Sequence, residues 1–111
     1  DTTILVSGAG GSIGSELCRQ LITLNPSKII LFDISEPCLY SIHQELINIK
    51  TRAIELIPVL GSATDEFLID RIFREHQINI VFHAAAYKHV PLVEINPLEG
   101  IKNNVFFNSP L

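Results

Sequence analysis

A glycine-rich segment at residues 7–14, Ser-Gly-Ala-Gly-Gly-Ser-Ile-Gly, constrains the fold more than any other part of the chain. It lies between a short apolar run at 4–6 and a helical pattern. Its regularly spaced glycines, Gly8, Gly11 and Gly14, allow a tight turn, a close backbone approach and a helix packed against its strand. A turn that opens into a helix N-terminus presents N–H groups and the positive end of the helix dipole to a pyrophosphate. The spacing alone fits a purely structural turn equally well, so the rest of the chain has to decide.

Apolar runs and helical patterns alternate along the whole chain. Short β-branched apolar runs are typical of buried strands, and apolar residues every three or four positions are typical of amphipathic helices. In chain order the predicted elements are a strand at 2–7, a helix at 12–24, a strand at 28–33, a helix from Ser35, a strand at 52–60, a helix capped by Thr64 or Asp65, a strand at 79–83, and a helix from Asn96 or Pro97 that carries Leu98, Ile101 and Val105 inward.

This alternation with short connections predicts an α/β fold. Right-handed crossovers then produce a parallel sheet with helices on both faces. We expect a Rossmann-like (β-α)4 half-domain with strand order 3-2-1-4, and a crevice where strands 1 and 4 diverge. The glycine turn follows the first strand, which is where such a half-domain binds its cofactor. Residues 1–111 are expected to form one domain that is truncated before the fifth strand.

Composition excludes several classes of function. Apolar residues make up 47% of the chain, which is enough for a core. The net charge is −4 and the Lys and Arg residues are scattered, which argues against a nucleic-acid or anionic-membrane surface. No apolar run approaches the roughly 20 residues that a membrane helix needs. Because the chain begins with Asp1 and contains no Met, we expect it to be a piece of a longer protein.

Cysteine and histidine spacing gives no indication of a metal site. Cys18 and Cys38 are isolated and fall in predicted helices, as expected of structural thiols in a reducing compartment. His43 and His76 lie in helical patterns, and the four histidines have no metal-ligand spacing.

An acidic residue ends the second predicted strand. Asp33 follows Gly14 by 19 residues, close to the spacing at which an acid accepts hydrogen bonds from the adenosine ribose. A carboxylate there repels a 2′-phosphate, and the next polar residues are Ser35 and Glu36 rather than Lys or Arg. This pattern favours NAD over NADP. The alternative is a solvated strand-end Asp or a helix cap.

The residues after the third strand give a weaker signal. Ser62 is placed to meet the adenine amino group, and Ala63 and Thr64 to line the adenine ring. Asp65 fits a helix cap better than a ligand.

The fourth strand ends in small residues, Ala84, Ala85 and Ala86. They would let the backbone approach the nicotinamide ribose, although packing of strand against helix explains them equally well. Lys88 and His89 follow on the crevice side, where they fit either contacts to a diphosphate or sugar or a solvated loop.

Three strings of residues resemble one family. They are the glycine segment extended to residues 7–20, the segment Asp33-x-Ser-Glu36, and the string His-Ala-Ala-Ala-Tyr-Lys-His-Val-Pro-Leu-Val-Glu at 83–94, with Asn96-Pro97 after it. Together they resemble the bacterial UDP-N-acetylglucosamine 4,6-dehydratases. These belong to the capsular and flagellar branch of the extended short-chain dehydrogenase/reductases. The string at 83–94 is the most specific, and the similarity spans essentially the whole chain.

The resemblance implies a reaction on a UDP-sugar in polysaccharide or glycan biosynthesis. Bound NAD would take a hydride from sugar C4, water would be lost across C5–C6, and the hydride would return to C6. The catalytic groups of such enzymes follow the fifth strand, so this chain is expected to contain none of them and to be inactive alone. The family also implies a cytoplasmic domain, in some members anchored by membrane helices elsewhere in the protein, and is compatible with a homo-oligomer.

The resemblance also implies roles for individual residues. The residues that would hold the pyrophosphate are Gly8, Gly11, Ser12, Ile13 and Gly14, and those that would hold the adenosine ribose are Asp33, Ser35 and Glu36. Ala84, Ala85 and Ala86 would flank the nicotinamide ribose, and Lys88 would face the nicotinamide or the substrate. Ser62 departs from the family, which usually has an Asp there. Two alternatives remain, a nucleotide-sugar epimerase or reductase and a non-catalytic dinucleotide-sensing module.

Overall fold

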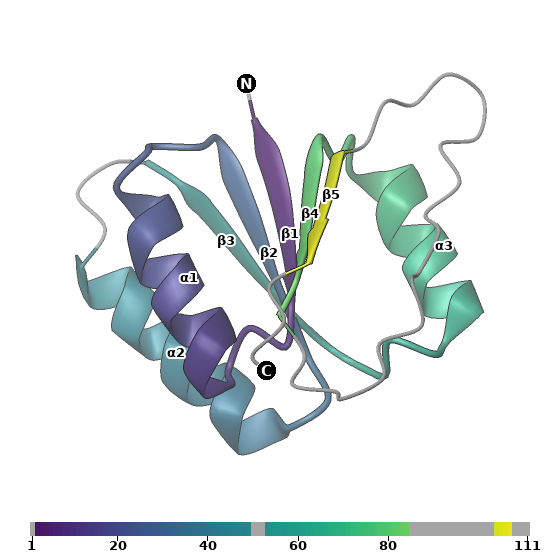
Figure 1. Ribbon diagram of the computed structural model, residues 1–111, viewed down its shortest axis with the longest axis horizontal. Coiled ribbons are helices and arrows are strands. Elements are labelled where there is room, and N and C mark those ends of the chain that lie inside the picture. The colour runs from purple at the N-terminus through teal and green to yellow at the C-terminus, as the bar shows by residue number, and fades with distance from the viewer. Residues whose placement is uncertain (1, 50–52, 85–103, 108–111) are drawn as a thin grey trace.

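The structure is a computed structural model that describes residues 2–49, 53–84 and 104–107 of the chain (Figure 1). Helices and strands alternate along most of it. In chain order the elements are β1 (Thr3–Ser7), α1 (Ser12–Ile22), β2 (Lys28–Asp33), α2 (Glu36–Ile49), β3 (Glu55–Leu60), α3 (Glu66–Glu75), β4 (Ile80–His83) and β5 (Asn104–Phe107).

All strands lie in one parallel sheet with the order β3-β2-β1-β4-β5. The predicted order 3-2-1-4 is therefore confirmed. The first helix ends at Ile22, earlier than predicted, because the chain turns at Asn25, which has a φ of 54°. Such a positive φ is incompatible with a continuing right-handed helix.

The prediction for the last part of the chain is wrong at β5. Val105 was expected on the buried face of a fourth helix, and the chain was expected to end before a fifth strand. Instead residues 104–107 pair with β4 in parallel, from Ile80 with Asn104 to His83 with Phe107. Val and Phe favour extended backbone, and pairing satisfies the N–H and C=O groups along the outer edge of β4. The expected helix start at 96–97 lies outside the described residues.

The central strands β1 and β2 are buried on both faces, as their apolar runs predict. Successive residues alternate: Val6 and Leu31 pack in one cluster with residues of α1 and α2, whereas Leu5 and Ile30 pack with Ile72 of α3. Figure 1 shows α1 and α2 on one face of the sheet and α3 on the other, so the prediction of helices on both faces is confirmed. Full burial of one such side chain contributes about 1.5–3 kcal/mol.

Parallel pairing brings the carboxyl ends of the strands to one edge of the sheet. Ser7 pairs with Phe32 on one side and with His83 on the other, and Asp33 pairs with Leu60. The carboxyl ends of β1, β2, β3 and β4 therefore lie side by side. This edge carries the residues singled out in the sequence.

Within residues 2–49, 53–84 and 104–107, no helix combines the length and apolar character that crossing a membrane requires.

Two leucines of different burial test this description of the core. Leu31 is 0% exposed and Leu24 is 73% exposed. Truncating Leu31 to Ala should lower the free energy of unfolding by about 2–5 kcal/mol, because a cavity replaces packed atoms. The same change at Leu24 should alter it by no more than about 0.5 kcal/mol. Urea denaturation of both variants measures the difference, and equal losses would contradict the assignment of the core.

Candidate functional site

The glycine turn between β1 and α1 is tied to the end of β2. Gly8 has a φ of 74°, a left-handed conformation that favours glycine. The N–H groups of Gly8 and Ala9 both donate to the Phe32 carbonyl, at 2.7 and 3.1 Å, and Gly11 N–H donates to the Gly8 carbonyl at 3.1 Å. The tight turn predicted at Gly8 is therefore confirmed, and its position is fixed relative to the neighbouring strand.

Gly14 permits the close packing of α1 on this turn. A Cβ atom built there would lie 2.0 Å from the Gly8 carbonyl oxygen, far inside van der Waals contact. At Gly11 the corresponding distance to the same oxygen is 3.4 Å, an ordinary contact, and the residue is exposed. Protein packing thus requires glycine at position 14 but not at position 11, where the bare backbone faces outward.

The first turn of α1 leaves its amide groups available. Its first intrahelical hydrogen bond runs from Ser15 N–H to the Gly11 carbonyl, so the amides of Ser12, Ile13 and Gly14 precede the hydrogen-bond ladder. The N-cap is Gly11, no side-chain cap bonds to these amides, and the first turn holds no acidic residue. The result is a helix N-terminus suited to an anion.

Helix α3 provides the contrast within the same chain. Its N-cap is Asp65, as predicted, and the carboxylate accepts a hydrogen bond from Leu68 N–H at 3.1 Å. A capping carboxylate occupies the position that an anionic ligand would take. Of these two helix N-termini, only that of α1 is left without a side-chain cap.

Asp33 lies beside the glycine turn with its side chain buried, at 8% exposure. Its Oδ2 accepts a hydrogen bond from Gly10 N–H at 2.7 Å, and its Oδ1 accepts one from Ser35 N–H at 2.9 Å. The carboxylate therefore joins the turn after β1 to the entry of α2. Burial rules out the solvated strand-end alternative, while the bond to Ser35 shows that Asp33 also organises the start of that helix. Glu36 is exposed in the first turn of α2.

The segment after β3 makes mostly local contacts. Ser62 Oγ lies 2.7 Å from Thr64 Oγ1 and accepts a hydrogen bond from Thr64 N–H at 3.1 Å. Ala63 is exposed. Gly61 N–H donates to the Asp33 carbonyl at 3.0 Å, which holds this segment at the same edge of the sheet.

A buried hydrogen bond joins the ends of β1 and β4. Ser7 Oγ bonds to His83 Nδ1, and both residues are under 9% exposed. Burial lowers the pKa of His83 from its usual value of 6.5, which favours the neutral imidazole. Ala84 is buried as well, and its N–H donates to the Ser7 carbonyl at 2.9 Å. Ala85, Ala86 and Lys88 lie outside the described residues.

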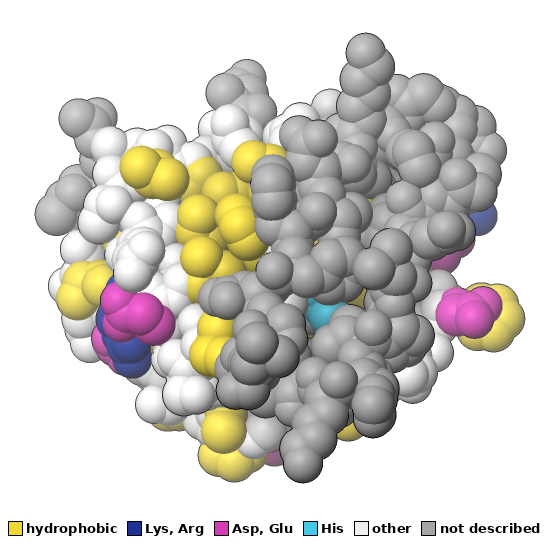
Figure 2. Space-filling model, in the orientation of Figure 1, with side chains coloured by type: hydrophobic (Ala, Val, Ile, Leu, Met, Phe, Trp, Pro, Cys, Tyr) yellow, Lys and Arg dark blue, Asp and Glu magenta, His cyan; other side chains and the backbone are white. Residues whose placement is uncertain are grey.

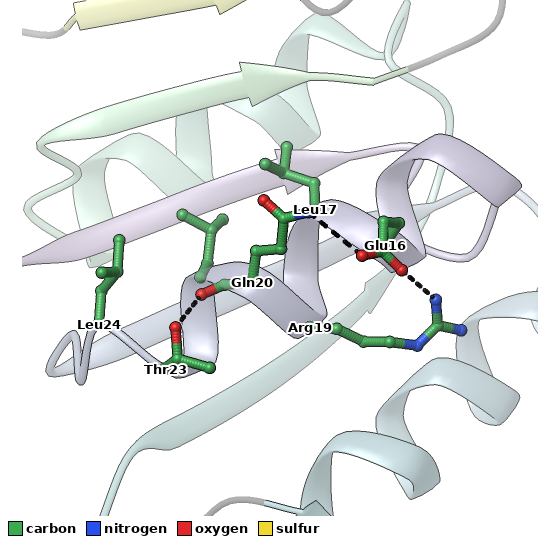
Figure 3. A pocket seen from close by; sticks show the side chains of 7 residues that line it. Glu16, Leu17, Arg19, Gln20, Thr23 and Leu24 are labelled. Carbon is green, nitrogen blue, oxygen red and sulfur yellow. Dashed lines mark hydrogen bonds and ion pairs between the residues drawn. The ribbon is translucent and has the colours of Figure 1, made fainter.

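A hollow of about 460 Å³ lies along the outer side of α1 (Figure 3). Its polar groups bond to one another: Glu16 accepts from Arg19 and Gln20, at 3.1 and 3.2 Å, and Thr23 donates to the Gln20 carbonyl at 2.6 Å. Arg19 also pairs with Glu45 of α2. Figure 2 shows hydrophobic side chains gathered on this face. With its polar groups paired locally, the hollow lacks the unpaired, converging donors found at the glycine turn.

Among the residues that the structure describes, no group of His, Cys, Asp or Glu side chains is placed to hold a metal ion.

Sequence reasoning missed two features of this edge. Gly10 falls between the spaced glycines, yet its N–H holds Asp33. The Ser7–His83 bond joins residues 76 positions apart. Neither has a local sequence signal, because each depends on strand register.

Known proteins share this sequence pattern and fold. A family profile described as "Polysaccharide biosynthesis protein" matches residues 4–109. The capsular polysaccharide biosynthesis protein CapD of Staphylococcus aureus is 50% identical over 103 residues, which are 93% of this chain and 17% of that protein. The UDP-N-acetylglucosamine 4,6-dehydratase (inverting) of Campylobacter jejuni is 31% identical over 107 residues, which are 92% of this chain and 29% of that protein.

A solved structure shows the same arrangement with ligands. UDP-glucose 4-epimerase from Bifidobacterium longum, in complex with NAD⁺ and UDP, matches with a TM-score of 0.62 and 29% identity, over 80% of this chain and 26% of that chain. Sheet order and glycine turn define our chain as a Rossmann-type domain. It belongs to the polysaccharide biosynthesis protein family, which confirms the resemblance noted in the sequence. The chain spans less than a third of the length of each of these three proteins.

Gly14 and Gly11 have different surroundings, so we expect their replacement by alanine to lower the stability by different amounts. Gly14→Ala should destabilise the protein by about 1–3 kcal/mol or more, since the added methyl overlaps the Gly8 carbonyl. Gly11→Ala should change the stability by less than about 1 kcal/mol. Chemical denaturation of both variants tests this, and a Gly14→Ala variant as stable as the parent would contradict the packing described.

The buried imidazole predicts a pH dependence of stability. The pKa of His83 is lowered in the folded state, so the unfolded state binds its proton more tightly. The stability from this residue should be fully present above the unfolded value of 6.5 and lost as the pH falls from there through the folded pKa. Melting temperatures of the parent and His83→Gln, measured across this range, should show a shallower pH dependence in the variant. Identical slopes would contradict the role of His83.

Proposed function

We propose that this chain is the NAD-binding part of a nucleotide-sugar 4,6-dehydratase that converts UDP-N-acetylglucosamine to a UDP-4-keto-6-deoxy sugar in polysaccharide or glycan biosynthesis. One observation carries the proposal. The uncapped N-terminus of α1 and the buried carboxylate of Asp33 lie on either side of one glycine turn. An anion site and a diol acceptor so placed match the pyrophosphate and the adenosine ribose of NAD.

The pyrophosphate is assigned to the turn and the start of α1. The amides of Ser12, Ile13 and Gly14 supply donors that the helix itself does not use. Gly8 shapes the turn, and Gly11 exposes backbone without a side chain in the way of a ligand. The same site would be closed to an anion if an acidic cap were present, as it is on α3.

The adenosine ribose is assigned to Asp33, with Ser35 and Glu36 beside it. A carboxylate has about four lone-pair sites, and backbone donors occupy one on each oxygen of Asp33. The remaining sites suit the two hydroxyls of a ribose. A 2′-phosphate would bring like charge against the carboxylate, so this site favours NAD over NADP.

The remaining contacts are assigned from the position after β3 for the adenine and from the family resemblance for the other groups. Ser62 and Ala63 are assigned to the adenine and Ala84, Ala85 and Ala86 to the nicotinamide ribose. Lys88 is assigned to the substrate side. Ser62 Oγ is already hydrogen-bonded to Thr64 through the hydroxyl and the N–H of that residue.

In this reaction bound NAD would accept a hydride from sugar C4 and return it to C6 after water is lost across C5–C6. This chain contributes binding and orientation. The edge of its sheet would hold the pyrophosphate and the adenosine ribose of the cofactor. The catalytic acid and base are assigned to parts of the complete protein outside this chain, in a cytoplasmic domain.

A nucleotide-sugar epimerase is the second candidate, because the UDP-glucose 4-epimerase above is about as similar to this chain, 29% against 31%, as the dehydratase. The string at 83–94 favours the dehydratase. A non-catalytic dinucleotide sensor is the third candidate.

Dinucleotide titrations test the cofactor assignment. NAD⁺ at about one hundred times its Kd should stabilise the protein by about 2.7 kcal/mol, and NADP⁺ should stabilise it less at the same concentration. Asp33→Ala should narrow the difference between the two dinucleotides, while Asp65→Ala, which removes the acidic N-cap of α3, should leave that difference unchanged. Thermal shift assays of the parent and of both variants, each with NAD⁺ and with NADP⁺, measure these differences. A stronger response to NADP⁺ would overturn the role of Asp33.

Mass spectrometry of the sugar nucleotide separates the three candidates. The complete protein, incubated with UDP-N-acetylglucosamine, should yield a product lighter by one water. An isomer of unchanged mass would point to the epimerase, and unchanged substrate with retained NAD binding would favour the sensor.

A further inference from the structure

Gly10 contacts the first turn of α2 across the glycine turn. A Cβ atom built on Gly10 would lie 2.6 Å from both the carbonyl carbon and the carbonyl oxygen of Cys38, and 2.7 Å from its Cβ. Backbone atoms at such distances cannot move aside as a flexible side chain can. Gly10 does not have a positive φ, so it is the absence of a side chain that the structure requires here.

The same residue holds the carboxylate that the proposed function assigns to the ribose. Gly10 N–H donates to Asp33 Oδ2 at 2.7 Å, and Ser35 N–H donates to Oδ1 at 2.9 Å. Ser35 in turn accepts a weak hydrogen bond from Cys38 N–H through its Oγ, at 3.4 Å. These contacts form a closed ring from the glycine turn through Asp33 and Ser35 to Cys38 and back to Gly10.

We infer that Gly10 is a positioning residue that sets the cofactor specificity of the site, because it locks the Asp33 carboxylate against the glycine turn. A side chain at position 10 must separate the turn from α2. This separation lengthens the hydrogen bond from Gly10 N–H to Asp33 Oδ2 and lets the Asp33 side chain turn away from the ribose. The pyrophosphate contacts at the start of α1 are made by other residues and are less affected. The inference rests on the proposed function, since it concerns the same dinucleotide site.

Gly10→Ala and Gly11→Ala form a matched pair of variants. Both add one methyl group to the same turn, but only the first overlaps α2. Gly10→Ala should lower the ratio of NAD⁺ to NADP⁺ affinity about tenfold, which equals about 1.4 kcal/mol and is the size of one hydrogen bond to a charged group. Gly11→Ala, next to the pyrophosphate, should weaken both dinucleotides alike and leave the ratio unchanged.

Isothermal titration calorimetry with NAD⁺ and with NADP⁺ measures the ratio of the two affinities in the parent and in both variants. If Gly10→Ala binds the two dinucleotides with the parent's ratio, the inference is overturned. A merely structural role would lower the melting temperature and both affinities without changing the ratio. If the parent protein binds neither dinucleotide, the proposed function fails instead, so the two failures are distinguishable.

Amide hydrogen exchange gives a second test that does not depend on the folding of Gly10→Ala. In the parent, the Gly10 amide should exchange more slowly than that of Ser12, because only the former donates to a buried carboxylate. Asp33→Ala should accelerate exchange at Gly10 and Ser35. Asp65→Ala should accelerate exchange at Leu68 alone. Unchanged exchange at Gly10 in Asp33→Ala would contradict the inference.

Discussion

The carboxylate of Asp33 is the point on which the functional edge of this domain depends. It is buried, and each of its oxygens accepts a backbone N–H from a different loop. Hydrogen bonds to a charged group are worth about twice those between neutral groups. Asp33 therefore links the turn after β1 to the entry of α2. One side chain thus fixes the geometry of two loops.

The parallel sheet makes this meeting possible. Its register sets Ser7 beside Phe32 and His83, so the carboxyl ends of three strands lie together at one edge. Alternating side chains along β1 and β2 fill a core on each face, which holds the strands in that register. A shift by one residue would move every side chain of a strand to the opposite face of the sheet. By holding this register, the core stabilises the alignment of Gly10 with Asp33 as well as the fold itself.

Local pattern predicted much of this arrangement and failed where long-range contacts decide. The bounds of β2 follow from one apolar run ended by an acid, and the roles of Gly8 and Gly14 follow from their spacing. Gly10 has no such signal, because its constraint is the backbone of Cys38 in another helix. At β5 the apolar residues 98, 101 and 105 fit a helical period, yet 104–107 pair with β4. Pairing with a neighbouring strand overrode the local pattern there.

The central claim is that the glycine turn and Asp33 form one dinucleotide site. It is tested most directly by following the backbone amide signals of the protein by NMR during titration with NAD⁺. We predict that the largest changes fall on Gly11, Ser12, Ile13 and Gly14 and on the Gly10 and Ser35 amides that bond to Asp33. Changes confined to the outer side of α1, around Gln20 and Leu24, would contradict the claim.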